Sequence, residues 1–450
     1  MQKETRESES PYMFGQTLLK RKMEINYDGI TPYNTSKKPR KQWRSLMLAQ
    51  YAASAAALIP VKHKTKKYGM EGVRPPYILL SNHHEFVDFE MSSLLTFPHR
   101  VNNICHIDGM VGKIPLMERL GCICKRKFTT DLHLIDSIDT VLNEFKGIIS
   151  IYPEARYTPI GTLAPLPEAL GRLVKRFEVP VVVILHHGNY LHMPFWDFRR
   201  RRKVPLFSEM KLILTSDQVK NMTSDEIYDT IVREMQYDEY DYQRENNIRI
   251  TEPFRAEGLH KVLYQCPSCG AESAMRSEGT ELYCSACGKR WEMDELGVLH
   301  AKSGKTEFPH IPDWFEWERM QVREQIYSGT YSYSDRVEVY SLPAEKFVHL
   351  GFADVTHDRE NGFIISGEYN GLPYRLQRKP LGMYGLHVEY DHMFVRPDDC
   401  FEVSCENDSL FCYPSAENII TKLSFATEEI YAYHMKKRSE RRLAKAALQT

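Results

Sequence analysis

The sequence has no apolar run long enough to cross a membrane as a helix. Such a helix needs about 18–20 mostly apolar residues. The longest candidate, Ser45 to Pro60, is shorter and contains Gln50. The first ten residues, MQKETRESES, are charged and lack an apolar core, so we expect no secretory signal peptide. If the protein meets a membrane, these absences favour attachment to its surface.

The sequence also has little net charge and few cysteines for its length. A formal charge of −1 leaves no basic field over the whole chain, so nucleic acid is not the expected partner. Ten cysteines in 450 residues are too few for a disulfide framework. Four of them form two C-x-x-C pairs, which indicates a metal site in a reducing compartment.

Two short basic runs stand out against this neutral background. The first run ends at Arg44, directly before the apolar stretch Ser45–Pro60. The second run is Arg199 to Lys203. Each run fits either contact with an anionic surface or an ordinary solvated face. The apolar stretch is accordingly either an interfacial helix, with the cations on lipid headgroups, or a helix buried against its domain. The cations of the first run are Lys37, Lys38, Arg40, Lys41 and Arg44.

Patterning divides the chain into four parts. Residues 1–40 form an irregular basic segment, and 41–250 alternate short β-rich runs with helical stretches. This alternation predicts an α/β unit with a mixed, largely parallel sheet flanked by helices. The apolar runs Tyr77–Ser81 and Gly147–Tyr152 are two of its strands, and a long charged helix, Ser224 to about Glu245, closes the unit.

The second half of the chain changes character. Residues 262–300 are rich in cysteine, and Trp314 to about Ile326 has helical spacing. Residues 327–450 are mostly β, with short Val-, Tyr- and Phe-rich runs between turn signals up to about residue 427. This pattern is typical of a β-sandwich or β-barrel. A basic helix, Glu428 to about Leu448, ends the chain.

His83 and Asp88 are the first pair that could carry chemistry. They follow the strand Tyr77–Ser81, so they lie at a strand's carboxyl end, where open α/β sheets bind ligands. An aspartate five positions along can accept the proton of one imidazole nitrogen and leave the other as a base. Such a histidine can deprotonate a hydroxyl that attacks a thioester. By itself the pair also fits an ordinary surface histidine.

Two further blocks carry charged residues at strand ends. Arg126 and Lys127 follow the short run Cys122–Lys125, and cations there can hold a phosphate. A charged strand exit explains them equally well. Glu154 and Arg156 follow the run Gly147–Tyr152; Arg156 could bind a substrate phosphate while Glu154 orients it.

Taken in order, four blocks resemble the glycerolipid acyltransferase family, which contains the lysophosphatidate (1-acylglycerol-3-phosphate) acyltransferases. The resemblance covers roughly residues 45–245. Two departures are visible: Ala155 stands where the family usually has Gly, with Arg156 one position early, and Lys127 rather than Arg126 has the family's spacing from Gly121. The matching blocks are Asn82-His83-x4-Asp88, Gly121 to Arg126, Tyr152-Pro153-Glu154-Ala155-Arg156 and Val179-Pro180-Val181.

The resemblance implies an enzyme that moves a fatty acyl group to the free hydroxyl of a lysophospholipid such as 1-acylglycerol-3-phosphate. It implies His83 as general base, Asp88 as its partner, and Arg126, Lys127, Glu154 and Arg156 as substrate-binding residues. The donor would be acyl-CoA or an acyl carrier protein, with no metal in the reaction. We expect a peripheral or monotopic protein on the cytoplasmic face of the cell membrane.

Cys266, Cys269, Cys284 and Cys287 form the metal motif. Each C-x-x-C pair is followed by a glycine, and fourteen residues separate the pairs. This spacing predicts tetrahedral Zn²⁺ in a zinc ribbon. Four thiolates leave no open coordination position, so we expect a structural role.

Other interpretations of the whole chain remain. The acceptor could be a different lysolipid. The zinc ribbon together with the basic C-terminal helix could belong to a nucleic-acid-binding protein, although the neutral net charge argues against it. A catalytically idle lipid-binding scaffold is a third possibility, and the presence of both His83 and Asp88 argues against it.

Overall fold

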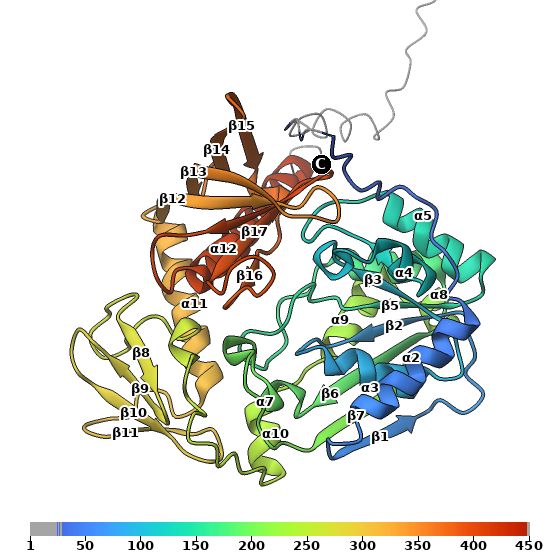
Figure 1. The fold of residues 1–450 in the computed structure, drawn as a ribbon, viewed down its shortest axis with the longest axis horizontal. Helices are drawn as coiled ribbons and strands as arrows, with labels where there is room; N and C mark the ends of the chain where they lie inside the picture. Colours follow the sequence, from blue (N-terminus) through green and yellow to red (C-terminus); the bar gives the residue numbers. More distant parts are fainter. Residues whose placement is uncertain (1–24, 26, 28, 448–450) are drawn as a thin grey trace, which may run out of the picture.

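The computed structural model describes residues 25, 27 and 29–447, with side chains to residue 444. Most of the predicted segment 1–40 therefore lies outside the described residues. Three sheets follow one another along the described chain, and Figure 1 shows them as three neighbouring bodies. No helix in this part of the chain has the length and apolar character that a bilayer span requires.

The first sheet is mixed and largely parallel, as the sequence predicts. Neighbouring strands run parallel except β6 and β7, which are antiparallel. The central strands β2 and β6 are almost wholly buried, which explains their continuous apolar runs. In spatial order the strands are β1 (His63–Tyr68), β7 (Leu206–Leu214), β6 (Val181–His187), β2 (Tyr77–Ser81), β5 (Ile148–Ile151), β3 (Val101–Cys105) and β4 (Ile123–Cys124).

Helices cover both faces of this sheet (Figure 1). Leu95 of α3 (Val87–Thr96) packs on Tyr77 and Leu79, and α2 (Arg44–Ala57) lies against α3. On the other face, α5 (His133–Asp139), α6 (Ala169–Phe177) and α9 (Ser224–Glu234) bury their apolar sides on Ile78 and Leu80. Shorter helices are α4 (Ile114–Arg119), α7 (Asn189–His192), α8 (Ser216–Asn221) and α10 (Glu239–Glu245).

The long helix predicted from Ser224 to Glu245 is wrong, because the chain breaks into α9 and α10. Asp238 causes the break. Its backbone is extended, and its carboxylate accepts hydrogen bonds from the backbone N–H groups of Tyr240 and Asp241, each at 2.9 Å. An aspartate with this geometry starts a new helix.

The second sheet is small and antiparallel, and it carries the cysteine pairs. Its core contains Trp291, which meets Trp314 of α11 (Ile311–Ser328) with ring centroids 5.0 Å apart. In spatial order its strands are β11 (Leu299–Ala301), β10 (Arg290–Met293), β9 (Glu281–Cys284) and β8 (Met275–Glu278).

The C-terminal part forms a single antiparallel sheet among the described residues, rather than the predicted sandwich or barrel. Helices take the place of a second sheet: Phe315 of α11 packs on Phe425 of α12 (Ile420–Ala447), and both belong to the sheet's core. The strands are, in spatial order, β15 (Leu372–Arg378), β14 (Gly362–Tyr369), β13 (Val348–Asp358), β12 (Ser332–Ser341), β18 (Ser409–Tyr413), β17 (Cys400–Ser404) and β16 (His387–Glu389).

This third sheet packs against the carboxyl edge of the first. Ile107 and Met110, just beyond β3, share an apolar cluster with Leu342, Phe411 and Tyr413 of the C-terminal part. The edge where β2, β5, β3 and β4 end is therefore partly covered by residues from 200 to 300 positions further along. That edge carries the predicted catalytic and substrate-binding residues.

The predicted apolar stretch Ser45–Pro60 forms α2 and lies at the surface. Leu48 is 52% exposed and Ile59 79% exposed, and Ala52 and Ala56 between them are also exposed. Leu48, Ala52 and Ala56 follow helical spacing, so α2 presents a stripe of apolar, mostly small side chains to solvent, and Ile59 lies in the turn just after the helix.

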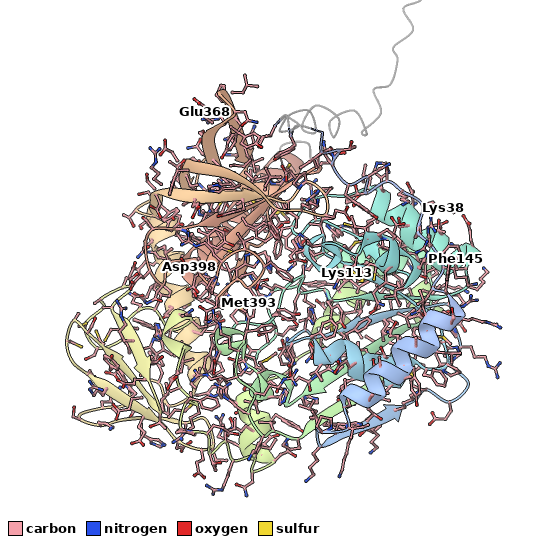
Figure 2. The ribbon with its side chains drawn as sticks, viewed as in Figure 1. Lys38, Lys113, Phe145, Glu368, Met393 and Asp398 are labelled. Carbon is pink, nitrogen blue, oxygen red and sulfur yellow. The ribbon has the colours of Figure 1, made fainter. Side chains whose placement is uncertain are left out.

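The basic run before α2 is paired within the protein. Lys37 Nζ lies 2.6 Å from Glu118, Lys38 pairs with Glu144, and Lys41 Nζ donates to the Phe145 carbonyl at 2.7 Å. Figure 2 labels Lys38 and Phe145 at this margin of the molecule. The second run is also engaged: Arg202 is buried against Asp197. Most cations of the two runs therefore have partners within the protein, whereas Arg44, Arg201 and Lys203 are exposed and form no ion pair among the described residues.

Candidate active site and metal centre

His83 and Asp88 lie together at the carboxyl end of β2. The His83 Nδ1 and Asp88 Oδ2 atoms are 3.0 Å apart. Because Asp88 is at the start of α3, the turn between strand and helix brings the two side chains face to face. An N–H on Nδ1 that donates to this carboxylate leaves Nε2 as the proton acceptor. Among the described residues, Nε2 has no hydrogen-bond partner, and the side chain is 22% exposed.

Asp88 is fully buried and held at both oxygens. Oδ2 also accepts the backbone N–H groups of His84 (2.5 Å) and Glu85 (3.1 Å), while Oδ1 accepts Asn189 Nδ2 at 2.7 Å. Burial raises the pKa of Asp88, but the hydrogen bond from His83 and the neighbouring imidazoles outweigh it and hold that pKa well below its usual range. The carboxylate is therefore ionised at neutral pH.

Two tyrosines enclose the His83 ring. Tyr152 stacks on it with centroids 4.0 Å apart, and Tyr157 lies tilted at 4.3 Å. Both come from the loop after β5, the neighbour of β2 in the sheet. Stacking and the hydrogen bond to Asp88 together fix the orientation of the imidazole ring. Its free nitrogen, Nε2, therefore has a defined position.

Glu154 lies in the same loop and is almost completely buried. Its carboxylate accepts the backbone N–H of Ala164 at 3.0 Å and the hydroxyl of Tyr237 at 3.1 Å. Burial raises the pKa of Glu154 to about 7, against the opposing effects of the Ala164 N–H and of Arg156. Its partners belong to the protein, so it braces this loop.

Ala155 has a left-handed backbone, with φ of +57°. Glycine adopts this conformation without the steric penalty that a Cβ brings. A glycine would therefore fit this position with less strain than an alanine. The loop keeps its left-handed turn here with an alanine.

Arg156 does not face open space. Its guanidinium contacts Glu428 Oε1 at 2.5 Å and Ser424 Oγ at 3.0 Å, and both partners lie on α12. Arg156 is 5% exposed, and Glu428 also pairs with Arg319 of α11. The C-terminal helix therefore places a carboxylate where we expected the substrate phosphate.

Arg126 is likewise occupied by the C-terminal part. Its two terminal nitrogens donate to the carbonyls of Leu342 (2.9 Å), Pro343 (2.8 Å) and Asn407 (3.0 Å), and to Ser409 Oγ. Arg126 is 2% exposed, so it is buried between the first sheet and the C-terminal part. The geometry gives Arg126 a structural role and does not support its predicted contact with a phosphate.

Lys127 belongs to a polar cluster that the sequence analysis missed. Its Nζ lies 2.8 Å from His387 Nε2, which is also 2.8 Å from Glu389. Asp108, His387 and Glu389 bring three possible metal ligands within 4.8 Å of one another. The Lys127 ammonium supplies one positive charge beside these two carboxylates, and His106 lies 3.0 Å from Asp108.

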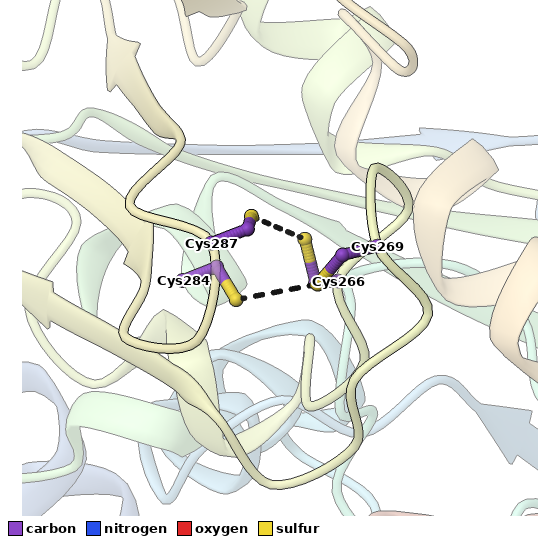
Figure 3. A group of neighbouring side chains, drawn as sticks. All are labelled: Cys266, Cys269, Cys284 and Cys287. Carbon is purple, nitrogen blue, oxygen red and sulfur yellow. Dashed lines mark hydrogen bonds between the residues drawn. The ribbon is translucent and has the colours of Figure 1, made fainter.

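The four cysteines converge as the spacing predicts (Figure 3). Cys266 Sγ lies 3.8 Å from Cys287 Sγ, and Cys269 Sγ lies 3.8 Å from Cys284 Sγ. A tetrahedron with Zn–S bonds of about 2.3 Å has sulfur–sulfur edges of about 3.8 Å, so the donor set fits Zn²⁺.

The glycines after the pairs complete this geometry. Gly270 and Gly288 have φ of +77° and +76°, and their N–H groups donate to the carbonyls of Cys266 and Cys284. Each tight turn folds its two thiols to the same side.

Several residues around His83 were not found from the sequence. Asn189, which holds Asp88, lies 101 positions away, and His192 pairs with buried Glu85 at 2.7 Å. Tyr152 and Tyr157 flank the P-E-A-R block, so their closeness to His83 could have been anticipated from the shared sheet edge.

Comparison with known proteins gives limited guidance. No protein-family model matches the sequence, and no curated protein matches it. Among solved structures, the chain is similar to the 1-acyl-sn-glycerophosphate (LPA) acyltransferase PlsC from Thermotoga maritima. That similarity has 16% sequence identity and a TM-score of 0.33, and covers 42% of this chain and 76% of the other. An overlap at this level does not establish a common fold.

Proposed function

We propose that the protein is an acyltransferase that moves a fatty acyl group from a thioester to the hydroxyl of a lysophospholipid. One observation carries the proposal: His83 is paired with a buried, ionised Asp88 at a sheet's carboxyl edge and keeps Nε2 free. The order of the sequence blocks around this pair supports the same chemistry.

In the proposed reaction, His83 Nε2 takes the proton of the acceptor hydroxyl while that oxygen attacks the thioester carbonyl. The tetrahedral intermediate collapses, the carbon–sulfur bond breaks, and the thiolate recovers the proton from His83. Asp88 holds the Nδ1–H tautomer and stabilises the imidazolium that forms between the two steps. The donor would be acyl-CoA or an acyl carrier protein.

The acceptor is less closely defined than the chemistry. Sequence resemblance favours a glycerol phosphate such as 1-acylglycerol-3-phosphate. The contacts of Arg126 and Arg156 favour the alternative, a lysolipid with a different headgroup, because both guanidiniums already bind groups of the C-terminal part.

We also propose that α2 attaches the protein to the cytoplasmic face of a membrane. Its support is the exposure of two large apolar side chains, Leu48 on α2 and Ile59 in the turn just after it. Because α2 packs on α3, which begins beside the His83 turn, attachment there would bring the catalytic edge near the lipid. Phe86, at the residue before α3, is also exposed.

The four cysteines would hold a structural Zn²⁺ in a zinc ribbon. Four thiolates fill the tetrahedral coordination shell, so the metal would stabilise the β8–β11 sheet and take no part in acyl transfer.

A direct assay tests the enzyme proposal. Purified protein is incubated with labelled acyl-CoA and a panel of lysolipids with different headgroups, and the products are identified by mass spectrometry. His83→Ala should lower turnover by about 10²–10⁴-fold. His133→Ala, on the exposed surface of α5, is the matched control and should keep full turnover. Equal turnover in both variants would remove His83 from the reaction.

A further inference from the structure

A basic cavity lies near the C-terminal end of α12, outside the candidate active site. Its volume is about 530 Å³. Five cations line it: Arg359 from the turn between β13 and β14, and Lys437, Arg438, Arg441 and Arg442 from α12. Glu360 is the single carboxylate in the lining. The cavity therefore carries a strong excess of positive charge.

The carboxylate in the cavity lining, Glu360, pairs with Arg359 at 2.9 Å and not with the cations of the helix. Within the described residues, none of these four side chains forms an ion pair with a carboxylate. Lys437 and Arg441 are four positions apart, as are Arg438 and Arg442, so each pair shares a helix face and repels. An anion between them would relieve the repulsion.

Arg359 forms a fixed part of the cavity wall. Its Nη1 donates to the Ile326 carbonyl at 2.9 Å, and its guanidinium lies 4.9 Å from the centre of the Tyr433 ring. His434 Nε2 donates to the Arg359 carbonyl at 2.7 Å. Lys437 Nζ is 5.0 Å from the same tyrosine ring, so the ring positions two cations. This part of the wall loses little freedom on binding, whereas the four cations of the helix are exposed.

The helix dipole does not account for this arrangement. Cations in the last turn of a helix are favoured by the partial negative charge there. Arg441 and Arg442 come before the last turn of α12, which runs to Ala447, and Arg359 comes from another element, so this effect does not explain the cavity.

We propose that this cavity binds a phosphate-bearing anion. Guanidinium groups form paired hydrogen bonds with phosphate oxygens, and three helix arginines could face one ligand. Leu381 and Tyr433 give the wall an apolar portion that suits the organic part of a phosphate ester. A soluble phosphate compound and an anionic lipid headgroup share this chemistry. The site does not depend on the proposed acyltransferase activity.

Binding measurements with the full-length protein test the proposal. Inorganic pyrophosphate is titrated by calorimetry, and co-sedimentation is measured with vesicles of phosphatidylcholine, alone or mixed with phosphatidate. The test variant is Arg438→Glu/Arg441→Glu/Arg442→Glu. The control, Arg176→Glu/Lys220→Glu/Arg233→Glu, makes the same charge change at exposed positions in or beside α6, α8 and α9, on the sheet face opposite α2.

We expect the wild type and the control to bind with similar affinity. The arginine variant should bind about tenfold more weakly or worse, because each cation adds to the free energy of binding a phosphate. Binding of pyrophosphate would show that the cavity binds a soluble phosphate compound without a lipid. Binding only to phosphatidate-containing vesicles would identify the headgroup. Equal affinities in the arginine variant and the control, or no binding to either probe, would overturn the proposal.

Discussion

Glu154→Gln should make the stability of the protein less dependent on pH. Burial raises the pKa of Glu154 to about 7 in the folded protein, while the unfolded chain keeps the ordinary value of 4.5. Between these two values the folded state holds a proton that the unfolded state has lost. By linkage, this contribution favours folding fully below about pH 4.5 and is lost as the pH rises towards 7.

The size of the effect follows from the gap between the two values. A gap from 4.5 to about 7, at about 1.36 kcal/mol for each pH unit, amounts to about 3 kcal/mol. Glutamine has nearly the same shape and can still accept the Ala164 N–H. From about pH 5 to about pH 8, the wild type should therefore lose roughly 2–3 kcal/mol relative to the variant.

Chemical denaturation at several pH values between these limits measures the difference. Glu345→Gln is the control, because Glu345 is exposed. Parallel pH curves for the wild type and Glu154→Gln would show that Glu154 is ionised in the folded protein at neutral pH. The account of the loop after β5, with a protonated carboxyl braced by Tyr237, would then be wrong.

Three other changes address catalysis, metal and membrane. Asp88→Asn should lower kcat by about 10²–10⁴-fold with the acceptor KM nearly unchanged, and steady-state kinetics showing an unaltered kcat would contradict its role as the partner of His83. Cys266→Ser should remove zinc and lower thermal stability, with activity falling only as the folded fraction falls; elemental analysis that finds no metal in wild-type protein would refute the zinc site. Leu48→Glu with Ile59→Glu should weaken vesicle binding but spare turnover on detergent-dispersed acceptor, and unchanged co-sedimentation would exclude α2 as the attachment.

Local patterns in the sequence predicted the first sheet well. The run Tyr77–Ser81 coincides with β2, because a strand buried on both faces leaves an unbroken apolar signal. The pairing of His83 with Asp88 and the meeting of the four cysteines also depend on short separations along the chain. Such contacts can be worked out from strand ends and turns.

Features set by distant residues could not be predicted in this way. Arg126 bonds to carbonyls more than 200 positions away, and Arg156 contacts Ser424, 268 positions away. Nothing in the residues around either arginine reveals these partners. The break at Asp238 was missed for a different reason: charged residues at helical spacing run through it, and only the backbone geometry shows that Asp238 begins a new helix.

The contacts of Arg126 and Arg156 limit how the protein can be divided in the laboratory. A fragment ending near residue 250 would contain the proposed catalytic pair, His83 and Asp88, but lose every side-chain and carbonyl partner named above for the two arginines. Both guanidiniums would then meet water or remain buried without partners, and a buried unpaired charge is strongly destabilising. Loss of activity in such a fragment would therefore say little about chemistry. Point substitutions in the intact chain keep the contact between the first sheet and the C-terminal part, so their effects can be assigned to single residues.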